Sequence, residues 1–157
     1  MKYLLMPPFF LLLLLVGCHT KPKEFTLVFT MESLQNYKMS IEIEKDKSYQ
    51  LHQQNMFFGT REEKEQIHTS QGKMTDEDYN RLSELIAGSH LFKMKDAYGF
   101  DQEADFNNPF DDLIYQITYT EGQNTKYISI RLNTTERFSD TFVQLLRFLS
   151  NYMSDNR

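Results

Sequence analysis

Hydrophobic and polar residues alternate along several stretches of this chain, and alternation with a period of two predicts β-strands. In residues 25–31 every second side chain from Phe25 is large and apolar, and residues 37–44 alternate more regularly still. A turn at residues 45–47 leads into residues 48–58, which alternate as a return strand. The pattern therefore predicts a single strand followed by a β-hairpin.

The same alternation returns in residues 113–120 and 126–132, on either side of Glu121-Gly122-Gln123-Asn124. Two alternating runs around a short glycine-containing turn are typical of a hairpin, and this is the strongest such signal in the chain. The charged residues 59–66 and the long segment 96–112 follow neither period, so both are predicted to be loops.

Two segments have the helical period instead. Thr75 is the expected N-cap of the first, with carboxylates in the first turn, apolar residues at helical spacing, and Gly88 expected to close the C-terminus. The second covers residues 136–153 and has a long apolar stripe that needs a packing partner. The apolar positions of the first are Tyr79, Leu82, Leu85 and Ile86, and those of the second include Phe138, Phe142, Leu145, Leu146, Leu149, Tyr152 and Met153.

The order strand, hairpin, helix, hairpin, helix predicts an α+β fold, in which an antiparallel sheet of about five strands carries both helices on one face. The chain has 157 residues, of which 40% are hydrophobic, and this suits a single domain over residues 25–157. The net charge of −5 and the absence of a basic cluster after residue 24 argue against nucleic acid as a partner.

The first 17 residues are different in kind. Lys2 precedes an apolar run that ends at Val16-Gly17, as in a secretion signal. The run is shorter than the ~20 residues that a helix needs to span a bilayer. Pro7-Pro8 also interrupts it, which disfavours a permanent membrane span. The sequence predicts a signal peptide at residues 1–17.

Leu15-Val16-Gly17-Cys18 resembles the lipobox of bacterial lipoproteins, and Cys18 is the only cysteine in the chain. The resemblance implies that the chain is cut before Cys18, whose sulfur carries a diacylglycerol with a further fatty acid such as palmitate on the new N-terminus. Two or three acyl chains at about 0.8 kcal/mol per buried CH₂ would anchor a protein stably to a membrane. The alternative is that Cys18 is one more apolar residue of a signal cut elsewhere. If the lipobox interpretation holds, residues 18–24 are a lipidated tether.

The lipobox resemblance also suggests a location. An aspartate after the cysteine tends to retain such proteins in the inner membrane, whereas this chain has His19. The expectation is a lipid-anchored protein of the cell envelope in the outer membrane, on either its periplasmic or its surface side. The predicted architecture is similar to that of small uncharacterised α+β lipoproteins of Gram-negative bacteria, and that similarity implies no catalytic motif.

The segment 96–112 is the strongest place in the sequence for binding chemistry, because long loops are frequently functional. It contains oxygen ligands at alternate positions, as a calcium loop does. However, Phe106 occupies the position where the loop needs glycine, and an aspartate replaces the usual final glutamate. The competing interpretation is a solvated acidic loop whose aromatic residues pack on the core. The candidate ligands are Asp101, Glu103, Asp105, Asn107 and Asp112, and the aromatic residues are Tyr98, Phe100, Phe106 and Phe110.

No catalytic constellation is recognisable in the sequence. The four histidines lack the spacing of zinc ligands, although His52 and His68 could meet across strands. The sequence contains no Gly-x-Ser-x-Gly and no glycine-rich phosphate loop. Paired carboxylates of segment 96–112 could serve as a general acid and base, but no cleft is predicted for them.

These observations predict a non-enzymatic envelope lipoprotein that binds another envelope protein or supports an assembly, with no cofactor apart from its covalent lipid. Three strand tyrosines, Tyr115, Tyr119 and Tyr127, are expected either in the core or on a partner surface. Two alternatives remain open. One is a calcium or small-ligand module centred on segment 96–112, and the other is an inhibitor that inserts this loop into an exogenous lysozyme or protease.

Overall fold

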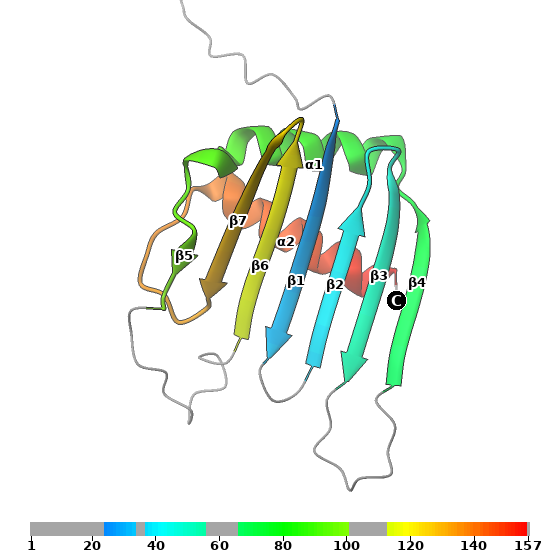
Figure 1. Cartoon of the computed structure of the whole chain (residues 1–157), viewed down its shortest axis with the longest axis horizontal. Helices are drawn as coiled ribbons and strands as arrows, with labels where there is room; N and C mark the ends of the chain where they lie inside the picture. The colour runs from blue at the N-terminus through cyan, green and yellow to red at the C-terminus, as the bar shows by residue number, and fades with distance from the viewer. Residues whose placement is uncertain (1–23, 34–36, 56–65, 101–112, 157) are drawn as a thin grey trace, which may run out of the picture.

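Within the part of the chain that the structure describes, a seven-stranded sheet forms the front layer and two helices form the layer behind it (Figure 1). The computed structural model describes residues 24–33, 37–55, 66–100 and 113–156. The strands are β1 (Phe25–Ser33), β2 (Tyr37–Ile43), β3 (Ser48–Asn55), β4 (Gln66–Lys73), β5 (Ala97–Tyr98), β6 (Leu113–Glu121) and β7 (Asn124–Arg131). The helices are α1 (Asp76–Ser89) and α2 (Asp140–Asp155), with the 3₁₀ turn η1 (Leu91–Lys93) after α1.

The sheet order is β4-β3-β2-β1-β6-β7-β5, so the first strand of the chain lies in the middle. β1 to β4 form an antiparallel meander toward one edge. The chain then crosses behind the sheet through α1 to the other edge, and the hairpin β6–β7 returns to pair with β1. The α+β class with two helices is confirmed.

The predicted strand number was wrong: the sheet has seven strands rather than about five, and it is mixed rather than wholly antiparallel. β4 was predicted as part of a loop or left unassigned, since its residues are mostly polar. β5 has only two residues and pairs with β7 in parallel, because the chain arrives at that edge from the crossing helix. It lies within segment 96–112, which was predicted to lack regular structure.

Strand alternation places the apolar side chains of the central strands on the face toward the helices. Phe25, Leu27 and Phe29 of β1 are fully buried there. Phe25 stacks on Tyr79 of α1 with ring centroids 5.1 Å apart, and Phe29 meets Tyr115 of β6 edge-on at 5.5 Å. The core that the described residues form therefore lies between the sheet and the two helices.

Helix α1 begins as its sequence predicts. The backbone N–H of Asp78 donates to the Thr75 hydroxyl oxygen at 3.0 Å, and the Thr75 hydroxyl donates to the Asp78 carboxylate at 2.7 Å. The predicted end was wrong, because Gly88 lies inside the helix and His90, in the left-handed conformation at φ 51°, terminates it. Gly88 instead faces Thr141 of α2.

Helix α2 is capped by Ser139, whose hydroxyl accepts from the Phe142 N–H at 3.3 Å. The helix therefore begins four residues later than the predicted residue 136. Its predicted apolar stripe is confirmed, since Phe142, Leu145, Leu149 and Met153 are almost completely buried. Both helices cover the same side, and no helix or strand of the described residues covers the other face of the sheet (Figure 1).

Candidate functional site

The residues that the sequence predicts for lipidation and for calcium binding lie outside the described part of the chain. This applies to the predicted lipidation site Cys18, and also to the predicted calcium ligands Asp101, Glu103, Asp105, Asn107 and Asp112. Both hypotheses remain predictions. A calcium titration followed by the melting temperature is the direct test of the second, because a ligand that binds the folded state raises that temperature.

The described residues contain no group of three or more His, Cys, Asp or Glu side chains that could hold a metal ion. Among the described helices, none is long and apolar enough to cross a membrane. The first candidate surface is the face of the sheet that the described helices leave open.

Sheet register decides which side chains reach this open face. The three tyrosines divide: Tyr115 and Tyr119 point toward the helices, whereas Tyr127 of β7 is on the open face and is 63% exposed. Burial raises the pKa of the Tyr119 phenol, and a hydrogen bond from its hydroxyl to Glu121 at 3.0 Å raises it further. Of the two expectations for these tyrosines, packing in the core therefore holds for Tyr115 and Tyr119, whereas Tyr127 lies on the surface.

The open face is built from short polar, β-branched and amide side chains in rows across the strands. One row runs from β4 to β7 and ends at Tyr127, and a second row lies beside it. Side chains in neighbouring strands of one row are separated by about 5 Å. The first row contains Gln71, Gln50, Glu42, Val28, Thr118 and Tyr127, and the second contains Thr69, His52, Ser40, Thr30, Gln116 and Ser129.

The two histidines that could have met across strands do not face each other. His52 of β3 pairs with Thr69 of β4 and is on the open face, where its Nδ1 lies 3.2 Å from the Thr69 hydroxyl. His68 is one position earlier in β4 and therefore projects from the opposite face. A one-residue difference in register separates the two rings, so they form no shared site.

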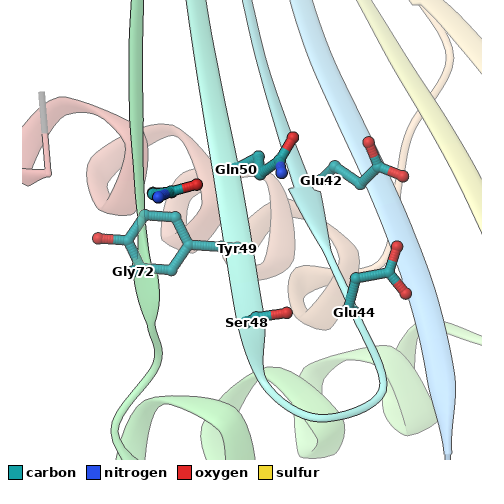
Figure 2. A pocket seen from close by; sticks show the side chains of 7 residues that line it. Glu42, Glu44, Ser48, Tyr49, Gln50 and Gly72 are labelled. Carbon is teal, nitrogen blue, oxygen red and sulfur yellow. The ribbon is translucent and has the colours of Figure 1, made fainter.

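A shallow polar hollow of about 470 Å³ lies over β2, β3 and β4 at the end of the sheet where β2 turns into β3 (Figure 2). Glu42, Glu44 and Gln50 project from neighbouring strands there, with Ser48 beside them (Figure 2). Within the described part of the chain, neither glutamate side chain makes a hydrogen bond or an ion pair. The hollow thus presents carboxylate and amide oxygens that can accept hydrogen bonds from a ligand or partner.

Two further residues at this hollow have a structural role. The Tyr49 ring lies beside Gly72 of the neighbouring strand (Figure 2). A Cβ on Gly72 would be 2.7 Å from the Tyr49 hydroxyl oxygen and 2.8 Å from Cζ, so glycine is needed for this approach. On the helix side the Tyr49 ring meets Tyr152 edge-on at 5.5 Å, and its hydroxyl donates to Asn156 at 3.3 Å.

This face presents groups that can form hydrogen bonds with a ligand or partner. Amide, hydroxyl and carboxylate groups are spread over a flat sheet, with an aromatic side chain at one side. The His52–Thr69 contact pairs an imidazole with a hydroxyl, but no carboxylate among the described residues contacts His52 to orient it. Sequence alone could not assemble these rows, because they depend on the pairing register of six strands.

The chain matches no protein-family model, and no curated protein is significantly similar to it.

Proposed function

We propose that this protein is a lipid-anchored component of a bacterial cell envelope, and that its α+β domain binds another envelope protein through the open face of the sheet. The role is non-enzymatic. The observation that carries the proposal is the position of Cys18, which ends an apolar signal-like segment and is the only cysteine in the chain.

The residues around Cys18 support a lipid anchor at this position. The apolar run before Cys18 is interrupted by two prolines and is followed by a polar segment, so it suits a cleaved signal better than a membrane span. A cysteine at such a junction gains a membrane-anchoring role only through acyl chains, whose burial is worth about 0.8 kcal/mol per CH₂. His19, where aspartate would retain the protein in the inner membrane, favours the outer membrane.

The open face supports a protein partner. Tyr127 is the most exposed of the large apolar side chains that the structure describes, and Val28 and Thr118 lie in the same row. Tyrosine is enriched at protein interfaces, where its ring supplies apolar area and its hydroxyl a hydrogen bond. The surrounding threonine, serine and glutamine side chains would supply the polar rim of such an interface.

The anchor is tested by mass spectrometry of the mature protein purified from a bacterial membrane. The expected N-terminal peptide begins at Cys18 and carries three fatty acyl groups, two of them in a diacylglycerol. Cys18→Ser should abolish that mass and release the protein from the membrane, whereas the neighbouring control His19→Ser should keep it. A wild-type chain that begins elsewhere, or that lacks lipid, would remove the anchor from the proposal.

The open face is tested with a photo-crosslinking amino acid placed at Tyr127 in living cells. The matched control position is Gln144, which is exposed on α2 behind the sheet. The proposal expects one defined protein adduct from position 127, none of the same mass from position 144, and loss of that adduct when Thr118→Arg is added. Equal adducts from both positions, or an adduct that survives Thr118→Arg, would contradict the assignment of this face.

A further inference from the structure

A second, chemically different cavity lies on the helix side of the sheet. α2 and the ends of β6 and β7 enclose a groove of about 450 Å³, a volume within the range of small-molecule sites. Its lining is mainly apolar, unlike the hollow on the open face. The lining residues are Tyr115, Ile130, Leu132, Thr134, Glu136, Phe138, Val143, Leu146, Arg147 and Ser150.

The α2 wall of this groove is one stripe of the helix. Val143, Leu146, Arg147 and Ser150 are related by steps of three and four residues, so they share one side of α2. The stripe changes character along its length, since Val143 and Leu146 are apolar whereas Arg147 and Ser150 are polar. At 1.5 Å per residue it extends for roughly 10 Å. The α2 wall of the groove therefore has an apolar end and a polar end.

The apolar end is accessible and its wall is fixed. Leu132 and Val143 are 36% and 40% exposed, which places apolar side chains at the mouth. Phe138 behind them is held by two ring contacts, with Tyr98 of β5 at 4.9 Å and with Phe142 of α2 at 5.3 Å. An aliphatic chain placed here would cover exposed apolar surface without displacing the core.

The polar end offers an uncompensated positive charge. Within the described part of the chain, the Arg147 guanidinium makes no hydrogen bond or ion pair. The carboxylate that lines the same groove, Glu136, is already engaged by Lys95, whose Nζ lies 2.5 Å from Glu136 Oε1. The Ser150 hydroxyl donates to the Leu146 carbonyl oxygen at 2.8 Å. Arg147 is thus the group at this end that is available to an anion.

We propose that this groove binds an aliphatic carboxylate, with its chain along Val143 and Leu146 and its carboxylate on Arg147. A planar guanidinium suits a carboxylate because two parallel N–H···O bonds can form, and charge-assisted bonds of this kind are among the strongest in proteins. The polarity of the stripe matches that of the ligand from one end to the other. This site is independent of the open face and of the anchor at Cys18.

The test uses the chain with Cys18→Ser, so that no covalent lipid competes for the groove. Decanoate, decanol and decylamine are titrated by calorimetry, because they share a chain and differ in the head group. Decanoate should bind at least about tenfold more tightly than decanol, as expected for a hydrogen bond to a charged group. Decylamine should bind more weakly than either.

Two variants locate the interaction. Arg147→Gln should remove the preference for decanoate over decanol, while Arg137→Gln, at an exposed arginine outside the lining, should keep it. Leu132→Asn should weaken the binding of decanoate and the binding of decanol to the same extent. Circular dichroism verifies the fold of each variant. All three side chains are exposed, so we expect the substitutions to leave the fold intact.

Three results would overturn the proposal: no decanoate binding at millimolar concentration, equal binding of all three compounds, or a preference for decanoate that survives Arg147→Gln. Amide chemical shifts of the folded protein provide an independent readout. Decanoate should shift the signals of Val143 and Leu146 and leave that of Tyr127, on the opposite face, unchanged; the reverse would place the ligand on the open face.

Discussion

Gly88 of α1 provides a sharp test of how the two helices contact each other. Glycine inside a helix is normally replaced by alanine with a gain of roughly 0.5–1 kcal/mol, because alanine loses less conformational entropy on folding. Here a Cβ at residue 88 would lie 2.7 Å from Cγ2 of Thr141 in α2. Thr141 is β-branched, so this methyl group can move away only if the side chain changes to another χ1 rotamer.

We therefore expect Gly88→Ala to be destabilising. Overpacking at such a contact costs about 1–3 kcal/mol, which exceeds the gain in helix propensity. The other Thr141 atoms, Cβ and Oγ1, would both be 3.6 Å from the new Cβ, which is ordinary van der Waals contact. Removing only the methyl group, by Thr141→Ser, should consequently reverse the sign of the Gly88→Ala effect.

Urea unfolding followed by far-UV circular dichroism measures the free energy of unfolding of the four proteins in this cycle. The expected outcome is a loss of stability for Gly88→Ala alone and a gain of roughly 0.5–1 kcal/mol in the Thr141→Ser background. Thr141→Ala, which also lacks Cγ2, should give the same reversal. A Gly88→Ala effect that agrees within about 0.5 kcal/mol in both backgrounds would refute the reasoning.

Three further outcomes are expected. Gly72→Ala should lower the free energy of unfolding by about 1–3 kcal/mol, because its Cβ would meet a Tyr49 ring already held on α2; an unchanged urea midpoint would contradict this. Tyr127→Ala should change stability by no more than about 0.5 kcal/mol in the same assay, since its side chain is 63% exposed, and a larger loss would mean that the ring is packed. Burial raises the pKa of Tyr152 to about 12 from 10.0, so the unfolded chain loses this proton first; its contribution to stability is complete below about pH 10 and is lost between about pH 10 and 12. Tyr152→Phe should flatten that alkaline loss in urea midpoints, and an identical slope for both proteins would oppose this assignment.

The parts of the fold that could be predicted from sequence are the segments whose pattern of apolar and polar residues fits only one type of secondary structure. β2, β6 and β7 alternate between apolar and polar residues, and α1 combines a Thr75 cap with an apolar stripe, so local chemistry and burial agree. β4 was missed because an edge strand of polar residues has no apolar alternation, and β5 because two residues carry no period. Gly88 was misread because a glycine near a helix end is usually a terminator, whereas here it allows two helices to approach.

The candidate surfaces were harder to predict for a different reason. Tyr127 and Glu42 share a row of the open face although 85 positions separate them in the chain, and only the pairing of β2, β1, β6 and β7 brings this about. The groove beside Arg147 likewise needs the placement of α2 against β7. Residue types in a sequence can indicate a metal loop or a lipobox, but they cannot indicate which faces of distant elements meet.

The position of β1 has a mechanical consequence. This strand is paired along its length on both sides, with β6 from Phe25 opposite Glu121 to Ser33 opposite Leu113, and with β2 from Leu27 opposite Ile43 to Ser33 opposite Tyr37. Tension applied through the residues before Phe25 would pull β1 along its own axis and load both hydrogen-bond ladders in shear at once. An attachment before Phe25 would thus load a strand that is paired on both sides, and pulling on that end would have to disrupt the centre of the sheet before any edge could peel away.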